Sequence, residues 1–559
     1  MCGIFAILNN NENVYSNKTI EAFFERGRNR GPENSKLLNI GKDLIIGFHR
    51  LAINGLDEIS NQPITIGCVT LICNGEIYNY TELYNMMNVV PETNSDCEVI
   101  IHLYKKYGIS QTLQMLDGVF SFILLDYDVT QDNAKMFVAR DPYGVRPLYR
   151  RHDVHNFTKN IFTFASELKM LPKMTGPNSF TSSVDHFQPG TYSVYHYPFT
   201  VNGQWLHDSN HLYHKTAFPL CIYGSKTNTN VRQYIDNIIT PNIQHYLKEA
   251  VYKRCAITDR PVACLLSGGL DSSLVTALTC EYLKSVGKHS RDLETYSIGM
   301  EGSVDLCYAR KVADYLGTTH TEILLTEQDF IDAIPEVIYS IESYDTTTVR
   351  ASIGNYLLGK YISQHSDAKV ILNGDGSDEL CGGYLYMRAC PDAIEFDKET
   401  RRLLQDIHAF DVLRSDKCIS SHGLEPRTPF LDRSWVQYYL SIPANIRYMT
   451  CMDECEKYLL RYAFSFSKFE NTEGKELLPK EVLWRRKEAF SDGVGKQTRS
   501  LYEIIGEKYD EKKYYKQQFI SHFGEDSSNV VPYLWMPKYV EAKDASARTL
   551  AIYKNEKSL

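Results

Sequence analysis

The chain has 559 residues, 43% of them apolar, so it is long enough for two to four domains with sizeable cores. Its formal charge of −9 is spread without a long basic or acidic block, which excludes the electrostatic pattern of a nucleic-acid or membrane-surface binder. The cysteines lack C-x-x-C spacing and histidine neighbours at metal-ligand intervals, so we expect reduced thiols. With no basic N-terminal flank and no apolar run of membrane-spanning length, we expect a soluble, cytoplasmic protein.

The residue pattern changes at about position 241. Short apolar runs separated by turn residues, typical of a layered β-rich domain, lie at 43–48, 69–73, 119–126, 134–139 and 161–165. Beyond residue 241, each apolar strand is followed by a Gly or Asp turn and a longer helical pattern, which predicts βα units and a parallel sheet. We predict domains at 1–214 and 241–559 joined by a linker at 215–240, although residues 231–250 also fit a helix.

Cys2 follows the initiator methionine, so removal of Met1 would place its thiol beside a free α-amino group. The thiolate is the attacking form of cysteine, and the terminal amine can serve as the base that generates it. Cys2 is therefore a candidate N-terminal nucleophile. Taken alone, Cys2 is better explained as a small apolar residue that begins a β-strand, and the rest of the chain reverses that preference.

The strongest local motif is Ser267-Gly268-Gly269-Leu270-Asp271-Ser272-Ser273, which lies between the strand-like residues 261–266 and the helical residues 274–283. Its glycines allow close backbone approach to a ligand, and its hydroxyls and helix-start N–H groups offer donors to an anion. The motif is no P-loop, because it lacks the lysine of that pattern. Asp271 places a carboxylate beside the expected phosphates, which suits a bridging Mg²⁺.

Two further strand ends, at 295–300 and 370–379, carry glycine and polar residues. Ligands of open α/β sheets bind beyond the carboxyl ends of strands, so three such ends predict one crevice, which we interpret as an ATP site. Asp375, Asp378 and Glu379 are dense enough beside these glycines for at least one of them to be a Mg²⁺ ligand.

Together these motifs resemble those of the glutamine-dependent asparagine synthetases. The resemblance covers nearly the whole chain and includes residues 1–4, 30–32, 48–53, 74–79, 94–96, 139–144, 165–169, 267–273, 345–351, 427–432 and 487–493. It implies an α+β, four-layer αββα N-terminal-nucleophile glutaminase domain, followed by an α/β parallel-sheet domain of the ATP-pyrophosphatase type.

For the first domain, the resemblance implies that Cys2 attacks the side-chain amide of glutamine and releases ammonia. The side chain of Asn74 and the backbone N–H of Gly75 would stabilise the oxyanion. Arg50 would grip the substrate carboxylate in a bidentate manner, and Asp96, with Glu76 nearby, would hold the α-ammonium group. The implied glutamine pocket comprises Arg50, Leu51, Ala52, Ile53, Asn54, Asn74, Gly75, Glu76 and Asp96.

For the second domain, the resemblance implies that ATP adenylates aspartate and that ammonia, arriving through an apolar tunnel, displaces AMP from β-aspartyl-AMP. The implied ATP site comprises Leu266, Ser267, Gly268, Gly269, Asp271, Ser272, Ile298, Gly299, Asn373 and Gly374. Asp271 and Asp378 would bind Mg²⁺, and Lys487 would neutralise phosphate charge. A homodimer would fit the family, while the residues leave the oligomeric state open.

Three positions depart from the family pattern. Asn373-Gly374-Asp375-Gly376 stands where the family usually has Ser-Gly-Glu-Gly, whose glutamate is associated with forming the adenylate. Asp375 is shorter by one methylene, about 1.5 Å of reach, and a displaced catalytic group can lose orders of magnitude in rate. Glu33 replaces an aspartate after Gly31-Pro32, which we interpret as a structural change.

Three alternatives follow from these residues. A related ligase could amidate another acid, which the pocket around 342–350 and Arg427 would decide. A glutaminase with an impaired synthetase half would follow from Asp375, although Asp271, Asp378 and Lys487 are retained. A phosphoribosyl amidotransferase would share the Cys2 opening but leaves the 267–273 loop unexplained.

Overall fold

A computed structural model describes residues 1–10, 14–40, 43–128, 133–155, 159–173, 179–198, 203–216, 222–224, 230–487, 493, 495, 500–546 and 549–550. The chain packs as two compact units. The first comprises Met1–Lys215, Ile419–Glu425 and Gln517–Pro532, and the second comprises Thr216–Cys418, Pro426–Lys516 and Tyr533–Leu559. Segments from the C-terminal half of the sequence thus complete the N-terminal unit.

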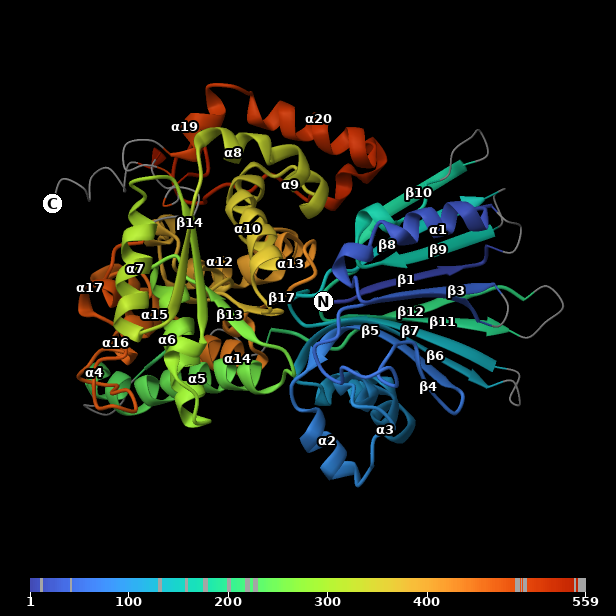
Figure 1. Ribbon diagram of the computed structural model, residues 1–559, viewed down its shortest axis with the longest axis horizontal. Helices are drawn as coiled ribbons and strands as arrows, with labels where there is room; N and C mark the ends of the chain where they lie inside the picture. Colours follow the sequence, from blue (N-terminus) through green and yellow to red (C-terminus); the bar gives the residue numbers. More distant parts are fainter. Residues whose placement is uncertain are drawn as a thin grey trace. The chain divides into compact units, whose positions relative to one another are not determined.

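The first unit is built on two antiparallel six-stranded sheets (Figure 1). In spatial order, one sheet consists of β10 (Ser179–His186), β8 (Tyr149–His155), β9 (Lys159–Ala165), β1 (Gly3–Leu8), β3 (Leu44–Arg50) and β2 (Asn34–Asn39). The other consists of β12 (Leu206–Leu212), β11 (Thr191–Pro198), β7 (Asn133–Arg140), β6 (Gly118–Asp128), β5 (Val69–Ile77) and β4 (Ile64–Ile66). Each apolar run predicted in this region forms part of a strand.

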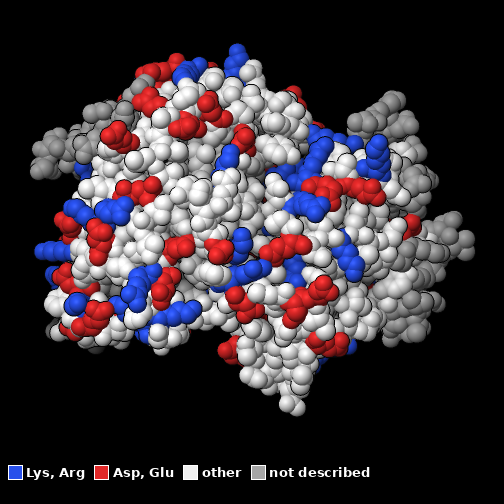
Figure 2. Space-filling view, in the orientation of Figure 1, with Lys and Arg blue, Asp and Glu red and all other residues white. Residues whose placement is uncertain are grey.

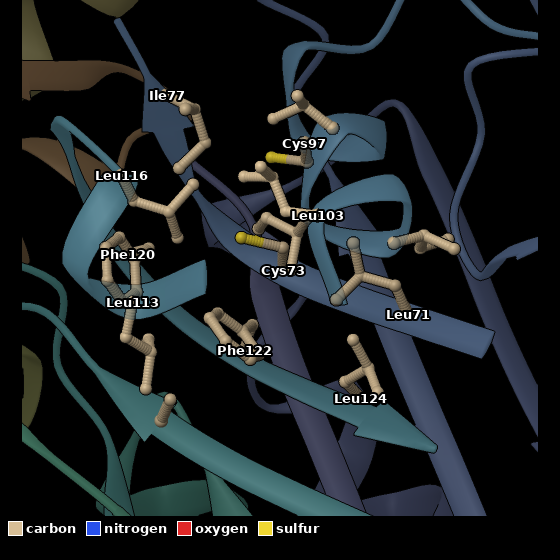
Figure 3. Close-up of a cluster of buried hydrophobic side chains, with 14 of the residues drawn as sticks. Leu71, Cys73, Ile77, Cys97, Leu103, Leu113, Leu116, Phe120, Phe122 and Leu124 are labelled. Carbon is tan, nitrogen blue, oxygen red and sulfur yellow. The ribbon is translucent and has the colours of Figure 1, made fainter. Parts of the chain in front are cut away.

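Helices cover the outer faces of both sheets. Helix α1 (Asn17–Glu25) lies on the first sheet, where a Cβ at Gly47 would come within 2.5 Å of the Phe24 ring. Helices α2 (Tyr80–Met87) and α3 (Val99–Met115) cover the second, and Leu103 and Leu113 pack with Phe122 and Leu124 of β6 (Figure 3). A second apolar cluster, with Ile4, Phe48, Ile72 and Val138 among its members, fills the space between the sheets. The predicted four-layer αββα fold is therefore confirmed.

Short helical turns connect these elements. They are η1 (Arg28–Arg30), η2 (Asp96–Glu98), η4 (Leu168–Met170) and η10 (Glu525–Val530). The N-cap hydroxyl of Ser95 accepts from the backbone N–H of Cys97, which fixes the start of η2 and with it the position of Asp96.

The second unit contains a five-stranded sheet in the order β15 (Thr319–Leu324), β14 (Glu294–Gly299), β13 (Val262–Leu265), β16 (Val370–Leu372) and β17 (Glu425–Arg427). Strand β13 pairs in parallel with β14 and β16, and β14 pairs in parallel with β15, which confirms the predicted parallel sheet. The chain runs from β13 to β14 on one side and returns to β16 on the other. The gap between β13 and β16 is thus the topological switch point where ligands of such sheets bind.

Helices α6 (Leu270–Ser285), α7 (Val304–Leu316) and α10 (Thr346–His365) pack against this sheet. Residues 231–250, which also fit a helix in the sequence, are helical, and the helical segment runs on to residue 256 as α4 (Val231–Tyr234), the π-turn η5 (Ile235–Ile239) and α5 (Thr240–Ala256). The remaining helical elements are η6 (Ser290–Asp292), α8 (Glu327–Asp332), α9 (Ile334–Ile341), α11 (Ser377–Cys381), η7 (Leu385–Ala389), α12 (Ala393–Asp406), η8 (Ile407–Ala409), α13 (Asp411–Ser420), η9 (Pro429–Leu431), α14 (Arg433–Ser441), α15 (Ala444–Asp453), α16 (Tyr458–Ala463), α17 (Lys480–Leu483), α19 (Leu501–Gly506) and α20 (Glu511–Phe523).

Two features of the described residues concern charge and membrane-spanning segments. Lys and Arg are interspersed with Asp and Glu over the face seen in Figure 2, so no extended single-sign patch marks that face among the described residues. No helix in the described ranges is long and apolar enough to cross a membrane.

Candidate active sites

Cys2 lies just before strand β1, where it meets strand β5 and the residues that follow β3. Its backbone nitrogen donates to Oδ1 of Asn74 at 3.1 Å, and its sulfur lies 3.7 Å from the carbonyl oxygen of Leu51. Nε of Arg30 donates to the Cys2 carbonyl at 2.9 Å, and Arg30 is itself ion-paired with Glu167. The backbone and side chain of Cys2 are therefore held by three residues distant in sequence.

The protonation state of the thiol depends on its surroundings. Burial raises the pKa of Cys2 to about 11, although the positive N-terminal amino group opposes this shift. The Met1 amino group is itself buried, which lowers its pKa, and it lies 3.6 Å from Glu425. With Met1 in place, Cys2 is thus a protonated thiol at neutral pH. Removal of Met1 would bring the amine onto Cys2 itself.

Asn74 has a side-chain donor available beside Cys2. The residue is fully buried, and its Nδ2 has no hydrogen-bond partner among the described residues. Because Oδ1 of the same amide accepts from Cys2, this donor lies close to the thiol. The neighbouring Gly75 has no room for a side chain, since a Cβ would lie 2.5 Å from the Val119 carbonyl. Buried donors are normally paired, so Nδ2 suits a developing negative charge.

The residues predicted to bind glutamine form a connected polar network. Nδ2 of Asn54 donates to Oε2 of Glu76 at 2.5 Å, and Oδ2 of Asp96 accepts from the backbone N–H of Ile77 at 2.7 Å. Nη1 of Arg50 donates to the Asp57 carbonyl and to Asn61 at 2.9 and 2.8 Å.

Arg50 holds the loop that follows strand β3. Its Nη2 donates to the carbonyl oxygens of Asn54 and Gly55, so both Nη groups are engaged. A bidentate contact with a substrate carboxylate would have to exchange at least two of these bonds. Leu51, Ala52 and Ile53 are buried in the same loop, where Glu33 accepts from the backbone N–H of Ala52 at 2.7 Å, a structural contact for Glu33.

In the second unit, a cavity of about 260 Å³ opens at the switch point between β13 and β16. Among the sequence-predicted residues, those that line it are Leu266, Ser267, Gly269, Asp271, Ser272, Ile298, Asn373, Gly374, Asp375, Asp378 and Lys487. Gly268 and Gly299 are not in the lining. A Cβ at Gly268, where φ is +69°, would lie 2.4 Å from the backbone nitrogen of Ala309, so this glycine lets α7 approach the loop.

The 267–273 loop is cross-linked by its own hydroxyls. Oγ of Ser267 and Oγ of Ser272 lie 3.0 Å apart, and the Ser267 backbone N–H donates to the Ser272 hydroxyl at 3.2 Å. A Cβ at Gly374 would come within 2.8 Å of the Ser272 backbone nitrogen. The loops after β13 and β16 therefore meet at the N-terminus of the 16-residue helix α6, which is a favourable place for an anion.

Asp271 and Asp378 converge on one positive charge. Nζ of Lys457 lies 2.6 Å from Oδ2 of Asp271 and 2.5 Å from Oδ1 of Asp378, and Nζ of Lys487 lies 2.6 Å from Oδ2 of Asp378. Burial alone would raise the pKa of Asp378, but the two ammonium groups outweigh it and lower the pKa. Two carboxylates around one cationic centre are also the ligand arrangement that Mg²⁺ accepts, so this pair fits the predicted metal.

Glu379, the other acidic residue beside Asp378, has a different hydrogen-bond partner. Its Oε1 accepts from the hydroxyl of Tyr384 at 2.5 Å, and burial raises its pKa. Glu379 therefore lines the cavity but does not join the acid pair around Lys457.

Asp375 is held by an arginine that its own loop helps to position. Nη2 of Arg414 donates to Oδ1 of Asp375 at 3.1 Å and also to Asp411, whose Oδ2 accepts from the Gly376 backbone N–H at 2.9 Å. The hydroxyl of Ser415 also interacts with the carboxylate of Asp375, whose Oδ2 is buried. Burial raises the pKa of Asp375 to about 6, against the lowering effect of Arg414.

Arg350 and Arg427, which the sequence places in the region that would select the acid to be amidated, bind other groups of the protein. Nε and Nη2 of Arg350 contact Glu511, and its Nη groups donate to Asp544 at 2.7 Å, so its charge is already neutralised. Nη1 of Arg427 donates to the backbone carbonyls of Arg254 and Ile257. The motif residues 488–492 lie outside the described residues.

Sequence reasoning missed Lys457, Arg414 and Asp411. Lys457 is 1% exposed and adopts φ +57° at the residue before α16, an uncommon conformation outside glycine. Its partners are 186 and 79 residues away in sequence, so no local pattern connects them. The sequence shows only a lysine between Glu456 and Tyr458, which gives no sign that its side chain is buried.

Comparison with known proteins gives matches along the whole chain. Residues 1–200 match the glutamine amidotransferase domain family, and residues 242–394 and 388–523 match the asparagine synthase family. The chain is 40% identical to "Asparagine synthetase [glutamine-hydrolyzing]" from Gallus gallus and 38% identical to that of Homo sapiens, with 99% of both chains covered in each case. Among solved structures, NMN synthetase from Francisella tularensis matches with 11% identity and a TM-score of 0.22 over 54% of this chain and 98% of that chain, a likeness too low to support a functional inference.

Proposed function

Because the chain belongs to the family of glutamine-hydrolysing asparagine synthetases, it is a ligase of glutamine-dependent asparagine synthesis, and we propose the residues and intermediates by which it works. Glutamine is hydrolysed in the first unit at Cys2. Aspartate is activated by ATP in the cavity of the second unit and is then amidated by the ammonia released.

In the glutaminase reaction, the α-amino group of Cys2, freed by removal of Met1, takes the thiol proton. The sulfur attacks the side-chain carbonyl carbon of glutamine, and the oxyanion accepts a hydrogen bond from Nδ2 of Asn74, the donor that lacks a partner. The tetrahedral intermediate collapses, ammonia leaves with the proton, and water hydrolyses the thioester to glutamate. Glu76 and Asp96 supply negative charge for the α-ammonium group of the substrate.

In the synthetase reaction, a side-chain carboxylate oxygen of aspartate attacks the α-phosphorus of ATP, and pyrophosphate leaves. The Ser267 to Ser272 loop and the start of α6 bind the phosphates, and Lys457 and Lys487 offset their charge. Ammonia then attacks the activated carbonyl carbon, and AMP departs with the carboxylate oxygen. Asp375, which lines the cavity, accepts the proton that the attacking ammonia loses.

Asp271 and Asp378 would hold Mg²⁺, which when bound supplies charge neutralisation for the triphosphate and the departing pyrophosphate. The observation that carries the proposal is their convergence from two separate strand ends on one cationic position at the switch point. A residual glutaminase with a disabled synthetase half is disfavoured, because Asp271, Asp378 and Lys487 all contact this position or its acids.

The test is a product balance. Purified protein is incubated with glutamine, aspartate and Mg·ATP, and glutamate, asparagine, AMP and pyrophosphate are quantified together. Equal amounts of asparagine, AMP and pyrophosphate are expected, and Cys2→Ala should form asparagine from added ammonia alone. Glutamate without AMP or asparagine would overturn the synthetase half, and asparagine from glutamine in Cys2→Ala would overturn the role of Cys2.

A further inference from the structure

The short side chain of Asp375 is anchored on two sides. Arg414 of helix α13 contacts one carboxylate oxygen, and Asp411 of the same helix binds both Arg414 and the Gly376 backbone N–H. The carboxylate and its own loop are therefore tied to the first turn of one helix. The residue lines the cavity, and its carboxylate also interacts with the hydroxyl of Ser415 on the same helix.

Asn373 adds a third link between this loop and helix α13. Its Nδ2 donates to Oγ of Ser415 at 2.7 Å, and its Oδ1 accepts from the Asp375 backbone N–H at 3.3 Å. Its backbone N–H donates to the Arg427 carbonyl at 3.1 Å, which fixes it at the end of β16. Asn373 is 3% exposed and Ser415 1%, so both bonds are shielded from water.

The residue type at 373 matters for this link. A carboxamide presents an acceptor and a donor about 2.2 Å apart, so it can reach Ser415 and the Asp375 N–H at the same time. A serine has one oxygen on a shorter side chain and cannot span both groups. Position 373 therefore carries a bridge that the serine of the resembled family pattern would not make.

We infer that Asn373 and Ser415 are positioning residues that, together with Arg414, hold the 373–376 loop so that the carboxylate of Asp375 reaches the acyl group of aspartate despite its missing methylene. This inference rests on the proposed function. It names the residues that allow the synthetase site to use Asp375, whose side chain is one methylene shorter than a glutamate. Since burial raises the pKa of Asp375 to about 6, a carboxylate so placed can exchange a proton near neutral pH.

The test is a double-mutant cycle on ammonia-dependent asparagine synthesis. Asn373→Ser should lower kcat about tenfold to a hundredfold, with the KM values for aspartate and ATP within about twofold, because the fault is one of placement. Asp375→Glu alone should also lose activity, since the longer side chain overshoots in the bridged loop. The double variant Asn373→Ser/Asp375→Glu should recover to within about threefold of the unmodified protein.

Controls separate this inference from folding and from the proposed function. Asn445→Ser removes an asparagine with two hydrogen bonds to the Tyr223 backbone in the same unit and should leave kcat unchanged. Ser415→Ala removes the hydroxyl that accepts from Asn373 and that also interacts with the Asp375 carboxylate, so it should lower kcat at least as much as Asn373→Ser. An unchanged kcat in Asn373→Ser, or a double variant whose loss is the product of the single losses, would overturn the inference. An unmodified protein that forms no asparagine or AMP would instead overturn the proposed function.

Discussion

Replacement of Lys457 by methionine removes the charge that holds Asp271 and Asp378 together. The lysine is almost fully buried, and methionine fills a similar volume without an ammonium group. The two oxygens that contact Nζ are at most 5.1 Å apart, the sum of the 2.6 and 2.5 Å ion-pair distances. In the variant these carboxylates face each other, and Lys487 still pairs with Asp378.

The size of the effect follows from that separation. Two unit charges about 5 Å apart at an effective dielectric constant of about 20 repel by roughly 3 kcal/mol. Loss of one partner from a buried ion pair costs about 3–5 kcal/mol, so the two values agree. Asp271 and Asp378 are 15% and 19% exposed, and Lys487 remains, so we expect about 2–3 kcal/mol. For a unit of this size, with an unfolding entropy of about 2.1 cal/mol/K per residue, this lowers Tm by about 3–5 °C.

The assay is thermal unfolding without nucleotide, with and without Mg²⁺. Lys457→Met should unfold about 3–5 °C below the unmodified protein. Millimolar Mg²⁺ should recover a part of that loss, because the ion can take the position of the ammonium group. Mg²⁺ should change the Tm of the unmodified protein by less. Lys253→Met, which removes a lysine 2.6 Å from the buried Asp432, is the matched control and should show no Mg²⁺ rescue. An unchanged Tm in Lys457→Met, or a loss that Mg²⁺ leaves untouched, would refute the reasoning.

Three further predictions concern single residues. Asn74→Ala removes the unpaired Nδ2 and should lower glutaminase kcat about 10²–10³-fold while ammonia-dependent synthesis persists; equal loss in both assays would contradict an oxyanion role. Gly383→Ala places a Cβ 2.0 Å from Oδ1 of Asp378 and 2.1 Å from Cε of Lys457, so its Tm should fall as in Lys457→Met, and a native Tm would show that the ion-pair geometry is wrong. Burial and nearby Arg310 lower the pKa of His320 from 6.5 to about 4. The unfolded chain therefore binds a proton at His320 more readily than the folded chain does, so the free energy of unfolding is highest above pH 6.5 and falls as the pH is lowered toward 4. His320→Gln should therefore flatten the acid side of the stability profile by about 1–2 kcal/mol, discounted for partial exposure, and parallel profiles would disprove it.

Much of the fold is predictable from local patterns. Buried parallel strands such as Val262–Leu265 and Val370–Leu372 are short continuous apolar runs before glycine or polar turns. Strand β5 extends beyond the predicted 69–73 because polar residues 74–76 continue the pairing with β6, where Asn74 lies opposite Ser121. A run of polar residues looks like a loop in the sequence, whereas here a partner strand supplies its backbone hydrogen bonds.

Some residues of the candidate sites could likewise be predicted from local sequence, and others could not. Ser267 to Ser272 and Asp378 could be predicted because each lies in a short motif at a strand end. Lys457 and Arg414 could not, because they act through ion pairs with acids 186 and 39 residues away. The partner of a buried charge is set by packing of distant segments, and a single sequence records that only as an isolated charged residue.

The most direct measurement is the fate of oxygen from aspartate labelled with ¹⁸O in its side-chain carboxylate. The protein is supplied with this aspartate, glutamine and Mg·ATP, and the products are analysed by mass spectrometry. Activation by adenylation predicts AMP that carries one ¹⁸O for each asparagine formed. Unlabelled AMP, or label in inorganic phosphate with ADP as the nucleotide product, would contradict the adenylate mechanism.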